Sequence, residues 1–241
     1  MCKRSLRYCS NLAEASMIQT TDTLAALART IPAASRVFHR HRLDFCCGGN
    51  RSLADVCAEK SIVPQNLIAE IEAEKPQDVS DVRWDLQSPE ALVEHILKVY
   101  HEPLRPELDR LLQMARKVER VHADKAVCPR GLAAHLAGMQ VAVDDHLEKE
   151  EKILFPMILS GQRGIVSMPI QVMVQEHDDH GASLRQTRAL TNDLRIPAEA
   201  CTTWHALYVG LEQFERDLMD HIHLENNVLF PMVLNASTSR V

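Results

Sequence analysis

Two stretches of the sequence carry histidine and glutamate at the same spacing. Residues 146–159 and 221–234, aligned without a gap, are identical at seven of fourteen positions, each displaced by 75 residues. In both stretches the histidine precedes the glutamate by four residues, as His146 precedes Glu150 and His221 precedes Glu225. On a helix this spacing places both side chains on one face, about 6 Å apart along the axis. One imidazole and one carboxylate can then converge on a metal ion between helices.

The duplication also identifies one further histidine in each half. His101 precedes His146 by 45 positions, and His177 precedes His221 by 44. The resulting four histidines and two glutamates are too many ligands for one tetrahedral zinc ion. We therefore expect a two-metal site in which each glutamate bridges. Imidazole-rich ligands favour first-row metals such as iron, and ligand type leaves manganese or a mixed-metal site open.

Spacing also sorts the side chains around these ligands. His95 lies about 120° around a regular helix from His101, so we expect it to be structural or at the surface. His122 is roughly 30 Å further along the same helix, too far to share the metal. Leu154 and Leu229 lie one turn beyond the glutamates and could form an apolar floor that excludes water.

Other neighbours of the ligands have weaker signals. Glu176 adjoins His177 and either tunes it, lines an access path or is a solvated acid. His180 either supports His177 from outside the ligand set or is unrelated to the metal. Asp145 and Asp220, each just before a ligand histidine, are expected at the surface.

The elements that position these residues are predicted to be helices. The sequence has only 8 Gly and 11 Pro in 241 residues and 4% aromatics, which disfavours a turn-rich β-sandwich or barrel. Ser88, Pro89 and Glu90 are typical of a helix start. The predicted bundle has four helices, at roughly 88–122 (distorted at Pro103 and Pro106), 130–159, 168–194 and 197–235.

The chain divides into a small domain and a large one. We predict a loose extension at residues 1–16, a small helical domain at 17–75, a linker at 76–87 and the four-helix bundle at 88–237. In the small domain, Ser52 is a candidate N-cap and Pro64 can open a further helix. The fold class is therefore all-α.

The small domain contains two adjacent cysteines, Cys46 and Cys47, in a sharp break that ends in Gly48 and Gly49. Glycines there let the backbone turn tightly and expose sulfur. The pair is either a relay for iron or nitric oxide, a redox contact with an acceptor, or a buried apolar pair at a turn. The other cysteines of the folded part are expected to be core or incidental: Cys57, Cys128 and Cys201.

Charge and hydropathy exclude several classes of protein. A formal net charge of −6 argues against a nucleic-acid binder. No apolar run approaches the roughly 18 residues of a membrane helix. The first residues lack the apolar core of a signal peptide, and seven cysteines without C-x-x-C spacing indicate reduced thiols. We expect a cytoplasmic protein.

These motifs resemble a known family. The bundle is similar to the hemerythrin-like domain, and the chain from about Met17 resembles the repair-of-iron-centres (YtfE/ScdA-type) di-iron proteins. The resemblance rests on the following segments: Asp44 to Gly49, Val118 to His122, the two Leu-Phe-Pro-Met runs, and Cys201 to Trp204. It implies iron ligands at the six positions that the repeat selects: His101, His146, Glu150, His177, His221 and Glu225.

The resemblance implies a function as well as a fold. It suggests two non-haem iron ions, bridged by oxo and carboxylate groups, and repair of iron–sulfur clusters damaged by nitrosative or oxidative stress. Iron would pass from a labile site to damaged iron–sulfur proteins, with nitric oxide or oxygen as small-molecule partners. The alternatives are a di-iron nitric oxide reductase or oxidase, and an iron or oxygen sensor that acts through a partner. The chain is expected to be a monomer or a homodimer.

Overall fold

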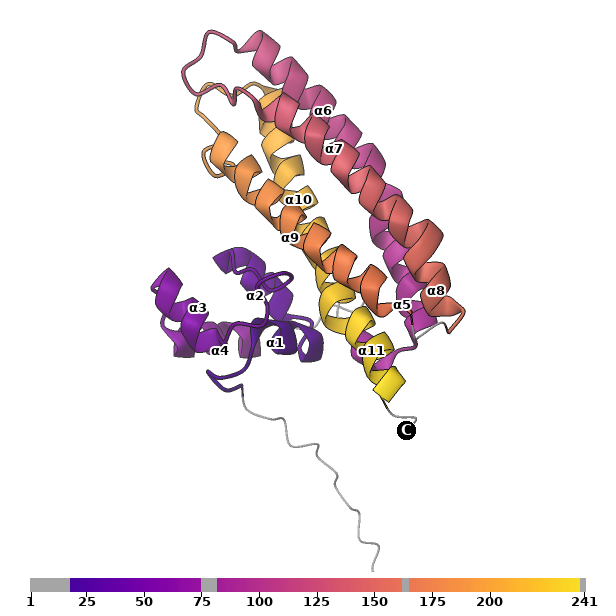
Figure 1. Cartoon of the computed structure of the whole chain (residues 1–241). Helices are drawn as coiled ribbons and strands as arrows, with labels where there is room; N and C mark the ends of the chain where they lie inside the picture. The colour runs from indigo at the N-terminus through magenta and orange to yellow at the C-terminus, as the bar shows by residue number, and fades with distance from the viewer. Residues whose placement is uncertain (1–17, 75–81, 162–164, 239–241) are drawn as a thin grey trace, which may run out of the picture.

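The computed structural model describes residues 18–74, 82–161 and 165–238 (Figure 1). Within these ranges the regular elements are helices, and an isolated bridge between Thr23 and Ser52 is the sole β feature. The prediction of an all-α fold is therefore confirmed. No helix of the described part combines the length and apolar character needed to cross a membrane. The extension expected at residues 1–16 lies outside the described residues.

Four long helical segments form the bundle, and three of them contain a short π-helical turn (Figure 1). In chain order the segments are α5 (Pro89–Ile96), η2 (Leu97–His101) and α6 (Glu102–Val121); α7 (Leu132–Lys149), η3 (Glu150–Leu154) and α8 (Phe155–Leu159); α9 (Ser167–Leu190); and α10 (Thr202–Leu224), η4 (Glu225–Leu229) and α11 (Phe230–Thr238).

Each π turn, η2, η3 and η4, precedes a proline by the same interval. Pro103, Pro156 and Pro231 each stand two residues after the last residue of a π turn. A proline inside a helix lacks the backbone N–H, and its ring collides with the carbonyl four residues earlier. The wider π turn relieves that collision, so the helix continues instead of breaking. The expected distortion at Pro103 is confirmed, whereas α6 runs through Pro106 without interruption.

Two ends of the long helices differ from the prediction. Helix α9 ends at Leu190, because Asn192, Asp193 and Leu194 have positive φ angles of 49°, 64° and 56° that no α-helix accommodates. Helix α10 begins at Thr202, after Cys201 in an extended conformation, five residues later than expected.

The bundle core is split into two apolar clusters along its length. One cluster includes Leu111, Leu136 and Trp204, and the other includes Ile96, Leu154 and Leu229. Buried polar side chains occur where each segment passes from one cluster to the other. These are His101 between Ile96 and Leu104, Glu150 between Leu147 and Leu154, His177 between Met173 and Leu184, and His221 between Leu218 and Leu224. The polar residues therefore form a layer with apolar side chains above and below.

The small domain consists of four short helices beside the bundle: α1 (Leu24–Thr30), α2 (Ala34–His41), α3 (Leu53–Lys60) and α4 (Pro64–Ala73) (Figure 1). The Ser52 hydroxyl accepts a 3.1 Å hydrogen bond from Asp55 N, as expected of an N-cap, and Pro64 opens α4. Fully buried side chains, including Phe38, Leu53 and Leu67, give this domain its own core.

Part of the predicted linker has structure. Residues Trp84–Leu86 form the single 3-10 turn η1, and the Trp84 ring lies 4.2 Å from the His95 ring. The linker thus packs on α5, and His95 has the structural role predicted for it. Residues 75–81 lie outside the described residues.

Polar contacts and one ring contact fasten the small domain to α10 and η4. The His39 Nε2 atom lies 2.9 Å from Asp220 Oδ1, and Asn227 Nδ2 donates to the Phe45 carbonyl at 3.0 Å. The Phe45 ring meets the buried His223 ring edge-on at 5.4 Å. Asp220 keeps 32% of its side chain exposed, in line with the predicted surface position, and in addition joins the two domains.

Replacing Gly49 should destabilise the small domain. A Cβ at this position would lie 2.3 Å from the Phe45 carbonyl oxygen and 2.9 Å from the Ala25 Cβ. We expect Gly49→Ala to cost about 1–3 kcal/mol in urea unfolding, because the backbone must shift. Gly138, exposed in α7, is the control: nothing lies within 4 Å of its Cβ position. Gly138→Ala should be stabilising by about 0.5–1 kcal/mol. An equal effect of both changes would contradict this account.

Acid should weaken the metal-free protein partly through His223. Burial lowers the pKa of His223 to about 4, against about 6.5 in an unfolded chain. Between these values the unfolded state binds more protons. Stability is therefore lost as pH falls from 6.5 to 4, by up to about 1.4 kcal/mol per pH unit for this group. The free energy of unfolding in urea should differ less between pH 7 and pH 5 for His223→Gln than for the unsubstituted chain. An unchanged difference would show that His223 does not titrate in this way.

Candidate metal centre

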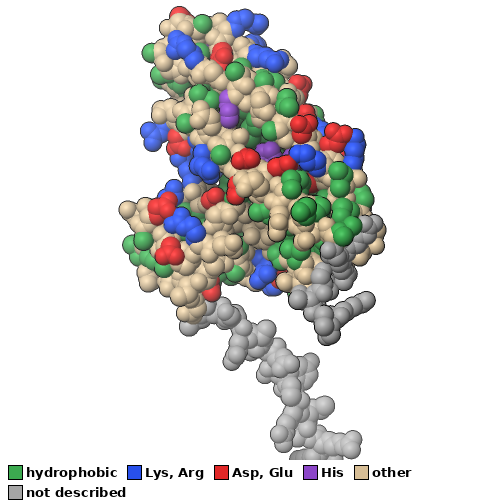
Figure 2. Space-filling model, viewed as in Figure 1, with side chains coloured by type: hydrophobic (Ala, Val, Ile, Leu, Met, Phe, Trp, Pro, Cys, Tyr) green, Lys and Arg blue, Asp and Glu red, His purple; other side chains and the backbone are tan. Residues whose placement is uncertain are grey.

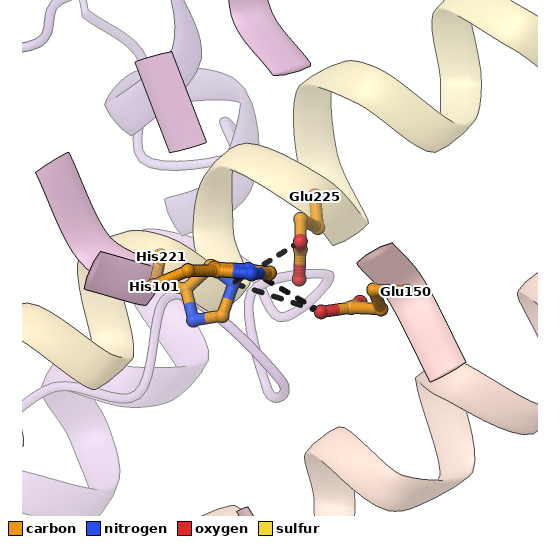
Figure 3. Close-up of side chains that lie close together, drawn as sticks. All are labelled: His101, Glu150, His221 and Glu225. Carbon is orange, nitrogen blue, oxygen red and sulfur yellow. Dashed lines mark hydrogen bonds and ion pairs between the residues drawn. The ribbon is translucent and has the colours of Figure 1, made fainter. Parts of the chain in front are cut away.

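The six side chains selected by the repeat form one buried cluster in the polar layer of the bundle, and none is more than 1% exposed. Their ligand atoms fall into two groups, within each of which all atoms lie within 4.8 Å of one another. The first group is His101, His221, Glu150 and Glu225 (Figure 3), and the second is His146, His177, Glu150 and Glu225. Both glutamates belong to both groups, as expected of bridging ligands.

The Glu225 carboxylate spans the two groups. Its Oε1 lies 3.1 Å from His221 Nε2, and its Oε2 lies 3.1 Å from His177 Nε2. Glu150 enters from the opposite side of the bundle, at the start of η3 (Figure 3). Its Oε2 lies 3.4 Å from His146 Nε2 and 3.5 Å from His101 Nε2. Each carboxylate therefore faces one imidazole from each group.

The imidazoles also meet in pairs. The Nε2 atoms of His101 and His221 are 3.0 Å apart, and those of His177 and His146 are 3.1 Å apart. Two nitrogen ligands at right angles around a metal, each bonded at about 2.1 Å, would be about 3.0 Å apart. The separations within both pairs fit adjacent ligands of one ion.

The carboxylates lack the hydrogen-bond donors that a buried charge needs. Within the described part of the chain, both oxygens of Glu150 and both oxygens of Glu225 are buried without a hydrogen bond of proper geometry, although imidazole nitrogens lie 3.4 Å from Glu150 and 3.1 Å from Glu225. Buried carboxylates are ordinarily neutralised, paired or bound to metal. The donor set and its unsatisfied oxygens therefore fit a pair of cations.

Without cations the two carboxylates titrate as a coupled pair. Burial, followed by the charge of Glu225, raises the pKa of Glu150 well above its ordinary value. Burial acts in the same direction on Glu225, but His221 and His177 outweigh it and hold its pKa well below the usual range. Burial, then His221, lowers the pKa of His101 to about 4. That imidazole is thus neutral at pH 7 and keeps a lone pair for a metal.

Three polar side chains hold the outward nitrogens of the histidines. Glu151 Oε1 lies 3.0 Å from His101 Nδ1, Glu176 Oε2 lies 2.9 Å from His146 Nδ1, and Asn226 Oδ1 lies 2.8 Å from His177 Nδ1. Such acceptors keep the proton on Nδ1 and turn the Nε2 lone pair inward. For the fourth histidine, His221, the described residues offer no hydrogen-bond partner to Nδ1, and Tyr100 stacks on its ring at 5.8 Å.

Sequence reasoning missed these supporting residues. Two interpretations of Glu176, that it tunes His177 and that it is a solvated acid, were wrong, since it contacts His146 across the bundle and also binds Lys149 at 2.6 Å. A signal for the other two was present, because Glu151 and Asn226 occupy equivalent positions, 75 residues apart, in the two halves of the repeat.

The structure also locates the other residues that were considered near the site. Leu154 and Leu229 are buried in the apolar cluster beside the ligands, as predicted for a floor. His180 packs edge-on against the His146 ring at 4.8 Å and belongs to neither ligand group. His122 lies away from the centre, 3.2 Å from Cys201 Sγ.

The turn that contains Cys46 and Cys47, here called the cysteine turn, contacts the helical segments that carry His177 and Glu225. Cys46 is 4% exposed and Cys47 is partly exposed, so the turn exposes less sulfur than expected. The Cys47 thiol donates to the His177 carbonyl at 3.3 Å, and Asn226 Nδ2 donates to the Cys46 carbonyl at 3.3 Å. One amide, Asn226, thus contacts both the cysteine turn and a candidate ligand.

Neutralising Glu176 should weaken metal binding without unfolding the chain. The substitution Glu176→Gln removes the charge that stabilises the Nδ1 proton of His146, and losses of this kind cost about 10–100-fold in metal affinity. Competition with a chromogenic chelator measures the change. Asp179→Asn removes an equal charge from an exposed position of the same helix and should leave the affinity unchanged. Equal affinities for all three proteins would show that Glu176 does not support the ligand.

Comparison with known proteins agrees with this architecture. Residues 92–233 match the hemerythrin HHE cation binding domain, and residues 20–75 match ScdA_N, a domain of unknown function (DUF542). The chain is 45% identical over 212 residues to the iron-sulfur cluster repair protein YtfE of Yersinia pseudotuberculosis serotype O:1b (strain IP 31758) and 44% identical to that of Yersinia pestis (strain Pestoides F). Each match covers 88% of this chain and 96% of the relative. The chain therefore belongs to the YtfE family, whose bundle is a hemerythrin HHE cation-binding domain.

Proposed function

We propose that this protein repairs iron–sulfur clusters damaged by nitrosative or oxidative stress, by donating iron from a di-iron site. The observation that carries the proposal is the pair of His/Glu groups that share Glu150 and Glu225. The YtfE relatives are iron–sulfur cluster repair proteins by name, which supports damaged iron–sulfur proteins as the acceptors.

The charge of the proposed ligands favours release of iron over its permanent storage. Two ferrous ions bring four positive charges, whereas the two shared carboxylates supply two negative charges. Four histidine ligands leave more coordination positions open than the five of an oxygen-carrying hemerythrin. Bound iron would be the metal that is donated, and it would also provide a binding site for nitric oxide or oxygen.

The proposal includes a role for the small domain. Cys46 and Cys47 lie behind His177, where a relay between the centre and an acceptor would be needed. We place the protein in the cytoplasm, with neither nucleic acid nor membrane as a partner, as a monomer or a homodimer. Reduced thiols at Cys46 and Cys47 are compatible with that compartment.

Metal content tests the site itself. We expect about two irons per chain in the purified protein, and a loss of both in the double variant Glu150→Ala with Glu225→Ala, because each carboxylate serves both groups. Elemental analysis measures this. The double variant Glu148→Ala with Glu212→Ala, which removes two exposed acids, is the matched control. One zinc ion per chain, or no metal in any variant, would contradict the di-iron assignment.

Transfer of iron tests the function on the same preparations. The ferrous protein should deliver iron to an apo-cluster acceptor faster than chelated iron does, and equal rates would overturn donation. Catalytic formation of N₂O over many turnovers would instead support a nitric oxide reductase. A metal-dependent complex with a partner, without iron transfer, would support a sensor.

A further inference from the structure

A second set of metal-ligating side chains lies in the turn between α2 and α3. The ligand atoms of Asp44, Cys46 and Cys47 all lie within 4.8 Å of one another. Cys46 Sγ is 3.6 Å from Cys47 Sγ and 3.4 Å from Asp44 Oδ1. None of these residues belongs to the His/Glu groups, so the set would be a separate site.

The separations match those around a tetrahedral ion. With metal–sulfur bonds of about 2.3 Å and metal–oxygen bonds of about 2.0 Å, a regular tetrahedron has a sulfur–sulfur edge of about 3.8 Å and a sulfur–oxygen edge of about 3.5 Å. The observed 3.6 Å and 3.4 Å lie close to these values. An ion could bind with little movement of the donors, and three donors leave a fourth position open.

The turn holds the three donors in place. Asp44 Oδ1 accepts hydrogen bonds from the backbone N–H groups of Cys47 and Gly48, both at 3.0 Å. Gly49 packs its backbone against the Phe45 carbonyl more closely than any side chain would allow. The turn therefore preorganises the side chains before an ion arrives.

One side of the set faces a cleft of about 850 Å³ between the small domain and the bundle, whose lining includes Asp44 and Cys46. On the face shown in Figure 2, basic and acidic side chains gather where the two parts meet. The cleft lining holds seven arginine and lysine residues against five aspartates and glutamates. The excess of positive charge weakens retention of a cation and attracts anionic ligands from an incoming protein.

The other side of the set contacts the His/Glu centre. The Cys47 thiol donates to the backbone carbonyl of His177, and Asn226 links the Cys46 carbonyl to His177 Nδ1. The three donors thus lie between a candidate ligand helix and an open cleft. This position suits a site through which an ion passes on its way out.

We propose that Asp44, Cys46 and Cys47 form a second metal site, which binds Fe²⁺ transiently through three donors. Its fourth coordination position faces the cleft and is completed by a thiolate of the acceptor. Binding replaces the two thiol protons, which leave to solvent, with no change in the oxidation state of the ion. Handover exchanges these ligands for acceptor thiolates, and the two cysteines take up protons again. The inference rests on the proposed function, since it names the exit route of the donated iron.

Anaerobic titration with Co²⁺ tests the site in the full chain, because thiolate-bound cobalt has charge-transfer absorption that His/Glu-bound cobalt lacks. We expect this absorption to reach, at saturation, the intensity of one thiolate-bound Co²⁺ per chain and to vanish in the double variant Cys46→Ser with Cys47→Ser. Cys201→Ser, which removes a partly exposed thiol elsewhere, should keep it. No such absorption in the unsubstituted chain, or its survival in the double variant, would overturn the proposal.

Two further measurements cover the case in which the double variant fails to fold. Asp44→Asn keeps an oxygen acceptor for the turn but removes the charge, and should weaken Co²⁺ binding by about tenfold or more, since even changes behind a ligand cost that much. In the unsubstituted chain, Co²⁺ should slow alkylation of Cys46 and Cys47, as read by peptide mass spectrometry. Unchanged affinity together with unchanged alkylation would overturn the site.

Iron analysis of the same samples separates the two proposals. Iron in the His/Glu centre without thiolate–cobalt absorption would refute the second site alone. Thiolate–cobalt absorption in a chain whose His/Glu centre takes up no iron would refute the di-iron function and leave the second site standing.

Discussion

The burial of two carboxylates in the middle of a helical bundle is the constraint on which the rest of the structure depends. Glu150 and Glu225 are fully buried, and their oxygens lack hydrogen-bond donors. Two apolar clusters enclose them from above and below. An arrangement of this kind is costly unless protons or cations compensate the charge. Four imidazoles, three of them held at Nδ1 from outside, complete a surrounding suited to cations.

The backbone meets this constraint through its π turns. A π turn inserts one residue into an α-helix and so changes which side chains face inward beyond it. The turns η2, η3 and η4 end at His101 or begin at Glu150 and Glu225. A proline two residues beyond each turn makes the regular helix unfavourable there. The same local chemistry therefore recurs on three segments, and each time it places a candidate ligand at the boundary of the two apolar clusters.

The small domain is coupled to the centre through two adjacent amides. Asn226 contacts His177 and the Cys46 carbonyl, and Asn227 contacts the Phe45 carbonyl and His223. Both amides belong to η4, directly after Glu225. Two hydrogen bonds of Asn226 therefore connect the cysteine turn to His177, and Asn226 is the next residue after the candidate ligand Glu225. The fold thus links the dithiol, the cleft and the His/Glu centre within a few contacts.

The sequence by itself determined the all-α fold, the helix starts at Ser52, Pro64 and Ser88, and the six side chains that meet in the bundle. Those features depend on local rules and on an internal duplication, and both are visible along one chain. Only the tertiary structure decided that Glu176 supports His146 and that Asp220 joins the domains. The reason is that each of those contacts joins helices far apart in the sequence. The assignment of metal to the six residues stays a prediction. The equivalent positions of Glu151 and Asn226 were visible in the repeat, but their role depends on the packing of η2 and α9 against them, which brings His101 and His177 within reach. Neighbours in sequence share a face through helical periodicity, whereas neighbours across a bundle meet only through packing.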